Sequence, residues 1–173
     1  MVFVLIKAAL LLATLPLAVP LSLAYQLLAA VRNAHLAYIG AFCAPVRFAA
    51  KPVVFVGYAV LAVLILSRLW PGVPTALRLP VVAYVVCLAT MAAQAAAWWR
   101  SRAGTPATDA HLARAAALGG LLFMASDSLL AINKFATPLP LASLWILLTY
   151  WVAQWCIASW LNPARTAGSP PAR

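Results

Sequence analysis

The chain has 173 residues, of which 66% are hydrophobic and 8% are charged, and its formal net charge is +10. Soluble domains carry roughly 25% charged residues, so a soluble fold is excluded, and the composition predicts an all-α, polytopic transmembrane helical bundle. The basic residues are scattered singly between apolar segments. This pattern indicates membrane topology and contacts with anionic membrane lipids, and it argues against nucleic-acid binding.

About six apolar segments follow one another in a single domain, each near the ~20 residues that cross a bilayer core. The first segment covers residues 3–19. Its alternative interpretation is a signal peptide, because Lys7 precedes a short apolar run. The second segment covers residues 21–44 and is the least regular, since it carries Arg32, Asn33 and His35 near its middle.

The third segment covers residues 52–70, and it follows the helix-start signal of Lys51-Pro52. The fourth segment covers residues 79–99. It ends in a pair of tryptophans followed by Arg100, which is typical of a membrane-interface anchor.

A hydrophilic loop then leads to the fifth segment, residues 110–132. Asp109 stands directly before it, where an aspartate can cap a helix, so we expect Asp109 to be the N-cap. The sixth segment covers residues 139–161. The remaining residues, 162–173, are rich in Pro, Ala and Gly, and we expect them to form a disordered cytoplasmic tail.

The basic residues separate into two groups that flank opposite sides of these segments. The positive-inside rule places the larger group in the cytoplasm, which predicts an inner-membrane protein with both termini cytoplasmic. The larger group is Arg47, Lys51, Arg100, Arg102, Arg114, Arg165 and Arg173, and the smaller group is Arg68, Arg78 and Lys134.

Asp127 is the most informative residue, because it is one of only two acidic residues and lies within the apolar run from Gly119 to Asn133. A carboxylate in a hydrophobic span costs about 3 kcal/mol on insertion scales, so such a residue faces the protein interior or a wet cavity. Gly120 shares its helix face and allows a neighbouring helix to approach closely. The alternative to a functional role is a hydrogen bond to a neighbouring helix.

Other polar side chains share helix faces inside the apolar segments. Tyr150 and Gln154 are four residues apart, and Tyr84 shares a face with Met91. Each pair could equally serve ordinary helix packing. His35 shares a face with Tyr38 and Phe42, and it is either a proton carrier or a packing residue.

At the end of the fifth segment, Asn133 and Lys134 can meet a phosphate headgroup, or Lys134 can simply extend to the membrane surface. No metal or organic cofactor is expected, because the cysteines form no CxxC pair and the histidines show no ligand spacing. These residues are Cys43, Cys87, Cys156, His35 and His111.

Several of these features together resemble the lysoplasmalogenase-like (YhhN) family of membrane proteins. The strongest match is residues 120–131, GLLFMASDSLLA, followed by residues 149–157, TYWVAQWCI. The resemblance covers residues 28–161, and two earlier helices also match it, through Pro80, Tyr84 and Met91 and through His35, Tyr38 and Phe42.

The chain departs from the family's pattern at its N-terminal side. Family members have about eight helices and a Gly-Asp pair on an early helix, whereas no acidic residue precedes His35 here. Residues 1–26 do not look like the family's early helices. The resemblance therefore implies a version that lacks roughly two N-terminal spans.

The resemblance implies a hydrolase that cleaves the vinyl-ether bond of a lysophospholipid substrate, the lysoplasmalogens, without a cofactor. Such chemistry needs a general acid, and a carboxyl in a low-dielectric site holds its proton more tightly. Two carboxyls would divide the acid and base roles, but Asp127 is the only intramembrane one here. We expect catalysis by Asp127, support from Tyr150, Gln154 and His35, and substrate binding by Tyr84, Ser126, Ser128, Asn133 and Lys134.

Two other functions stay open. The first is an inactive or truncated protein of the same fold with a lipid-binding or structural role, which the missing early carboxylate favours. The second and weaker one is a small proton-linked transporter component, in which Asp127 is the proton site; no internal repeat supports it. The oligomeric state does not follow from the sequence.

Overall fold

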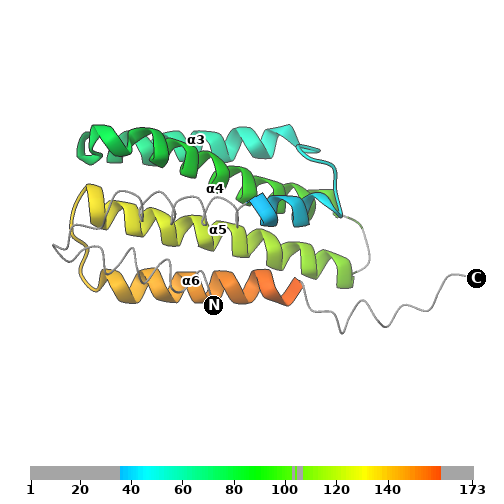
Figure 1. The fold of residues 1–173 in the computed structure, drawn as a ribbon. Coiled ribbons are helices and arrows are strands. Elements are labelled where there is room, and N and C mark those ends of the chain that lie inside the picture. Colours follow the sequence, from blue (N-terminus) through cyan, green and yellow to red (C-terminus); the bar gives the residue numbers. More distant parts are fainter. Residues whose placement is uncertain (1–35, 103, 105–106, 161–173) are drawn as a thin grey trace, which may run out of the picture.

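A computed structural model describes residues 36–102, 104 and 107–160. Within these residues all regular structure is helical. Consecutive long helices run antiparallel to one another along one bundle (Figure 1). After a helical segment at residues 36–43 come α3 (Pro52–Leu69), the 3-10 helix η1 (Trp70–Gly72), α4 (Thr75–Ser101), α5 (Ala107–Phe135) and α6 (Ala142–Trp160).

The four long helices are each long and apolar enough to cross a membrane. This confirms the predicted all-helical membrane protein, although four candidate spans are found in the described part of the chain and not six. The expected span 3–19 and the tail 162–173 lie outside the described residues. Of the expected span 21–44, only residues 36–43 are described as helix.

The start of α5 corrects one expectation. Because α5 begins at Ala107, Asp109 lies inside its first turn, and the prediction that Asp109 is the N-cap is wrong. Nothing in Ala107 and Thr108 opposes a helix, and an acidic residue in the first turn still interacts favourably with the helix dipole. Similarly, α4 begins at Thr75, four residues ahead of the expected span, so Pro80 lies inside the helix and not in its first turn.

The two groups of basic residues lie toward opposite ends of the bundle. The start of α3, the end of α4 and the start of α5 share one end, and η1 and the α5–α6 connection share the other (Figure 1). In the described residues the first end carries Arg47, Lys51, Arg100, Arg102 and Arg114, and the second carries Arg68, Arg78 and Lys134. Which side of a membrane each end meets stays a prediction.

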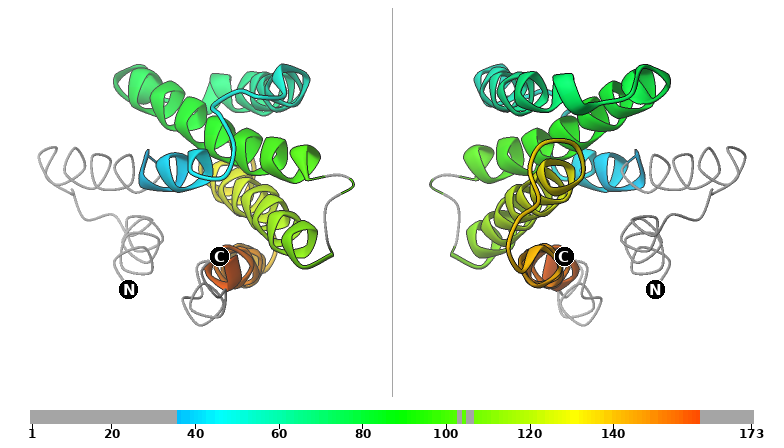
Figure 2. Two further views of the ribbon diagram at one scale, coloured as in Figure 1. Left: turned by 90° about the vertical axis from the view of Figure 1, so that its right-hand side faces the viewer. Right: turned by 90° about the vertical axis from the view of Figure 1, so that its left-hand side faces the viewer.

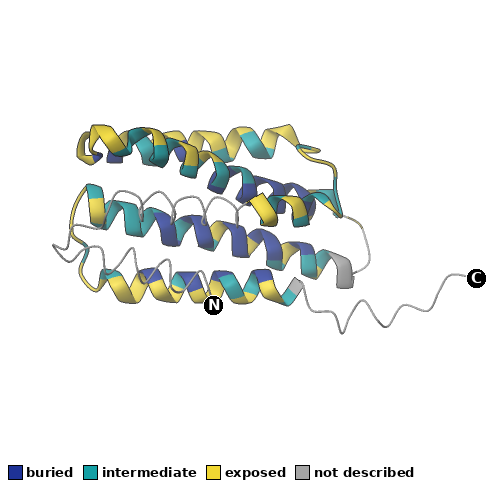
Figure 3. Ribbon diagram, in the orientation of Figure 1, coloured by how far each residue is buried: buried dark blue, intermediate teal, exposed yellow. Residues whose placement is uncertain are grey.

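Helix α5 is the centre of the bundle, with α4 and α6 packed against it and α3 against α4 (Figure 2). Most of its residues are buried or half-buried, whereas α3 and the outer side of α6 are largely exposed (Figure 3). A β-carbon on Gly119 would lie 2.7 Å from Ile157 Cγ1 of α6, and one on Gly120 would lie 3.1 Å from Ala92 Cα of α4. Two consecutive glycines thus let both neighbouring helices approach closely.

A buried amide joins the helical segment 36–43 to α4. The side chain of Gln94 is completely buried, and its Nε2 donates to the carbonyl oxygens of Phe42, Val46 and Arg47 at 3.2–3.3 Å. Its Oε1 accepts a hydrogen bond of 3.2 Å from the Ala49 N–H. Gln94 therefore provides hydrogen-bond partners for backbone groups at the end of the helical segment 36–43. It also holds the loop that leads to α3 in place.

We expect Gln94→Met to lower the stability of the bundle by about 1–3 kcal/mol, because buried backbone groups lose their partner while the side-chain volume is kept. The measurement is thermal unfolding of the purified protein in detergent. Gln154→Met is the matched control. It makes the same replacement at an amide that accepts one hydrogen bond of 3.3 Å from a side chain and binds no backbone group among the described residues. Equal melting temperatures for the Gln94 variant and the wild type would contradict this role.

Candidate functional site

Asp127 lies inside the bundle, where α5 faces α4. Its side chain is only 6% exposed, and the Tyr84 hydroxyl of α4 donates a hydrogen bond to its Oδ2. The carboxylate therefore faces the protein interior and not the lipid. A hydroxyl that donates to a carboxylate is a charge-assisted hydrogen bond, and it holds the carboxylate in one orientation.

Tyr150 of α6 lies near the same region of α5. It is 2% exposed, and its ring packs edge-on against Phe123 with 5.7 Å between centroids. Phe123 precedes Asp127 by one helical turn, so both lie on one face of α5. The Tyr150 hydroxyl and the Asp127 carboxylate are near enough to interact electrostatically.

A fourth segment completes this group. The Tyr38 hydroxyl, on the helical segment 36–43, donates a hydrogen bond of 3.3 Å to Oε1 of Gln154 in α6. Gln154 follows Tyr150 by one turn of α6. We call Tyr38, Tyr84, Asp127, Tyr150 and Gln154 the tyrosine–aspartate cluster. It contains one carboxyl, one amide and three phenol hydroxyls from four segments.

The two serines beside Asp127 bind backbone in this structure. The Ser126 hydroxyl donates to the Ile146 carbonyl oxygen of α6 at 2.8 Å, and the Ser128 hydroxyl donates to the Met124 carbonyl oxygen at 2.7 Å. Ser126 thus ties α5 to α6. The observed contacts of both serines are structural, and a role in substrate binding stays a prediction.

Asn133 and Lys134 lie at the end of α5, away from the cluster. Oδ1 of Asn133 accepts a hydrogen bond of 2.9 Å from the Leu139 N–H, which anchors the α5–α6 connection, and Lys134 is exposed. Six and seven residues separate them from Asp127, or about 9–10 Å along a helix. His35 lies outside the described residues.

Sequence inspection alone assigns no site role to Tyr38 or Gln94. Tyr38 is recognised there only as part of a matching helix, and Gln94 not at all. The available signal is the one that identifies Gln154, a polar side chain within an otherwise apolar segment. That signal does not tell which polar residues meet, because the contacts join segments that are far apart in sequence.

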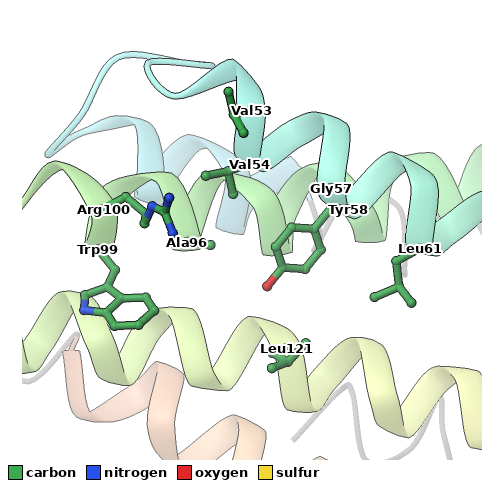
Figure 4. A pocket seen from close by; sticks show the side chains of 9 residues that line it. All are labelled: Val53, Val54, Gly57, Tyr58, Leu61, Ala96, Trp99, Arg100 and Leu121. Atoms are coloured by element: carbon green, nitrogen blue, oxygen red, sulfur yellow. The ribbon is translucent and has the colours of Figure 1, made fainter.

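Two cavities lie beside α3, away from the cluster. One has a volume of about 420 Å³ and the other about 350 Å³, and Tyr58 lines both. In the larger cavity, Trp99 and Arg100 stand at one end and Leu61 at the other (Figure 4). Asp127 lines neither cavity, so both are distinct from the carboxyl site.

Within the described residues, no three His, Cys, Asp or Glu side chains gather where they could hold a metal ion. The three cysteines, Cys43, Cys87 and Cys156, are free thiols. The tyrosine–aspartate cluster itself offers a carboxyl, phenol hydroxyls and an amide. A buried carboxyl beside hydroxyl donors can transfer a proton and orient a water molecule.

A model of the YhhN family matches residues 5–161 of the chain. The match begins well ahead of residue 28, so the family's pattern extends further toward the N-terminus than the inspected motifs indicate. It includes every residue of the tyrosine–aspartate cluster. No solved structure matches the chain.

Proposed function

The chain belongs to the YhhN family, and we propose that it is an integral-membrane hydrolase of lysoplasmalogens. It cleaves their vinyl-ether bond to give a fatty aldehyde and a glycerophospho-base. The observation that carries this proposal is the buried carboxyl of Asp127, held by the Tyr84 hydroxyl at the centre of a membrane bundle. An intramembrane carboxyl in contact with a proton donor suits acid-catalysed cleavage of a lipid.

The first step is protonation of carbon. Asp127, in its acid form, gives its proton to the vinyl carbon that is further from the ether oxygen, and the double bond supplies the electron pair for the new C–H bond. The positive charge is then shared between the other vinyl carbon and the ether oxygen as an oxocarbenium ion. Tyr84 stabilises the remaining carboxylate, because its hydroxyl already donates to Oδ2.

The second step is capture of water. Water adds to the oxocarbenium carbon and returns a proton to the Asp127 carboxylate, and the resulting hemiacetal collapses to the aldehyde and a free glycerol hydroxyl. One water molecule is consumed and Asp127 is regenerated. A single carboxyl thus acts first as acid and then as base, as the acid/base residue of retaining glycosidases does.

Tyr150 and Gln154 are placed to assist the second step. Tyr150 lies near enough to Asp127 to interact with it electrostatically, and Gln154 is one turn further along α6. Their hydroxyl and amide groups can orient the attacking water or hold the ether oxygen. The bond of Ser126 to the Ile146 carbonyl oxygen holds α5 against α6, and substrate binding by Ser126 and Ser128 stays a prediction.

The Tyr84→Phe variant tests the contact that defines this site. We expect its rate of aldehyde release to fall about 10- to 100-fold, because a hydrogen bond to a charged group contributes about 1.5–3 kcal/mol. The ring remains, so the melting temperature should change little. Tyr58→Phe, at a tyrosine that lines the α3 cavities, is the control. Unchanged release by Tyr84→Phe would contradict the assigned contact.

A second candidate is a lipid-binding protein of the same fold without activity. The observation in its favour is that the only other acidic residue, Asp109, lies in the first turn of α5 and cannot join Asp127 in one site. The chain therefore has no second carboxyl that could divide the acid and base roles with Asp127. Aldehyde release that depends on Asp127 would exclude this candidate, and binding of lysolipid without release would support it.

A further inference from the structure

Arg78 at the η1 end of the bundle has the properties of an anion-binding residue. Its guanidinium carbon lies 4.9 Å from the centre of the Trp70 ring, so a cation–π contact holds it. The side chain is half-buried, and among the described residues its Nε has no hydrogen-bond partner. Of the two aspartates, Asp109 lies at the opposite end of the bundle and Asp127 is bonded by Tyr84.

A backbone contact holds η1, and with it Trp70, against the end of α5. Gly72 lies so close to the carbonyl oxygen of Phe135 that a β-carbon at this position would overlap that oxygen. Lys134, the exposed neighbour of Phe135, therefore stands at the same end of the bundle as Arg78. Together with Arg68 in the last turn of α3, Arg78 and Lys134 bring three cationic side chains from different helices to this end of the bundle.

The distance from this end to Asp127 fits the proposed substrate. Arg78 precedes Tyr84 by six residues and Lys134 follows Asp127 by seven, which correspond to about 9–10 Å along each helix. In a lysoplasmalogen, seven covalent bonds separate the phosphorus from the carbon that is protonated, an extended reach of about 9 Å. A phosphate at Arg78 would therefore place the vinyl ether beside Asp127.

The opposite end of the bundle does not fit in the same way. Arg100 lines the larger α3 cavity and is also a cation beside a tryptophan (Figure 4). It follows Tyr84 by 16 residues on α4, however, or about 24 Å along the helix. A phosphate bound there would leave the vinyl ether well short of Asp127.

We propose that Arg78, held by Trp70 and assisted by Lys134, binds the phosphate of the lysophospholipid substrate. The bound substrate then lies with its headgroup at the η1 end and its alkenyl chain along the bundle, past Asp127. A guanidinium suits this task, because its N–H groups can donate two parallel hydrogen bonds to a phosphate. This inference rests on the proposed function for the identity of the ligand.

The test uses two ligands that the enzyme cannot hydrolyse. One is a 1-alkyl lysophosphatidylethanolamine, which has the phosphate but a saturated ether, and the other is the corresponding 1-alkylglycerol, which lacks the phosphate. Binding of each to the full chain is measured in nanodiscs for the wild type, Arg78→Gln, Arg78→Lys and Arg100→Gln. The Arg100 variant is the matched control, since it removes one cation from the opposite end.

We expect Arg78→Gln to weaken binding of the phosphate ligand about 10- to 100-fold and to leave alkylglycerol binding unchanged. Arg78→Lys should recover part of the affinity, and Arg100→Gln should behave as the wild type. An equal loss for both ligands would show a packing role and overturn the inference. Unchanged binding of the phosphate ligand by Arg78→Gln, or a loss that appears with Arg100→Gln instead, would also overturn it.

Hydrolysis separates this inference from the proposed function. Suppose that the wild type releases no aldehyde, but Arg78→Gln weakens binding of the phosphate ligand and not of the alkylglycerol. The hydrolase proposal then fails and the phosphate site stands. If the wild type releases aldehyde and Arg78→Gln has an unchanged KM, the phosphate site fails and the hydrolase proposal stands. When both proposals hold, Arg78→Gln raises KM more than it lowers kcat. The reason is that the phosphate is bound equally in the ground state and in the transition state.

Discussion

Replacement of Asp127 by Asn is expected to reduce aldehyde release from a lysoplasmalogen by about a thousand-fold or more. An amide cannot give its proton to carbon, and a general acid/base group typically contributes about 10²–10⁴-fold, here with Asp127 acting in both steps. The variant keeps an oxygen that can accept the Tyr84 hydroxyl, so the contact between α4 and α5 is preserved. The measurement is aldehyde release by the purified proteins at equal concentration.

Asp109→Asn is the matched control for this experiment. It removes the only other carboxylate side chain of the chain, and it does so in the first turn of α5, far from the tyrosine–aspartate cluster. We expect the Asp109 variant to release aldehyde at the wild-type rate. Activity that survives in Asp127→Asn, or that is lost equally in both variants, would contradict the role given to Asp127.

Replacement of Gly119 by Val is expected to lower the stability of the bundle markedly. A β-carbon at this position would lie 2.7 Å from Ile157 Cγ1 and 3.0 Å from the Ala153 carbonyl oxygen. The second atom belongs to the backbone of α6, so α6 itself has to move. Overpacking of a well-packed core costs about 1–3 kcal/mol, and a backbone shift places this change at the upper end.

Gly57→Val provides the comparison, because a β-carbon on Gly57 of α3 would meet nothing within 4 Å. Both changes place the same side chain in a helix that can span a membrane. We expect the melting temperature in detergent to fall clearly for Gly119→Val and to stay unchanged for Gly57→Val. Since α6 carries Tyr150 and Gln154, the Gly119 variant should also lose activity. Equal melting temperatures for the two variants would contradict the close packing of α5 on α6.

The fold class follows from the sequence because the hydrophobic length of each segment is itself the physical requirement for crossing a membrane. The burial of Asp127 follows in the same way, since exposing its carboxylate to lipid is costly. Its partner is harder to foresee. Tyr84 is visible as a polar residue in the preceding segment, but only the register of α4 against α5 shows that its hydroxyl reaches Oδ2.

Other features depend on tertiary contacts that leave a weak trace in the sequence. The N-cap expected at Asp109 is wrong because helix ends are set by local backbone preferences over several residues, and α5 begins at Ala107. Gln94 lies within a run of alanines and gives no sign that it binds the loop around Arg47. Arg78 resembles any basic residue between spans until its contact with Trp70 is seen.

The most direct test of the central claim is hydrolysis of a lysoplasmalogen by the purified chain in D₂O, with the aldehyde trapped by reduction and analysed by mass spectrometry. Protonation on carbon by Asp127 predicts a full-length aldehyde that carries one deuterium on the carbon next to the carbonyl, formed in equal amount with the glycerophospho-base. The proposed mechanism would be contradicted by a full-length aldehyde without deuterium or by a shortened aldehyde. It would also be contradicted if the wild-type protein released no aldehyde.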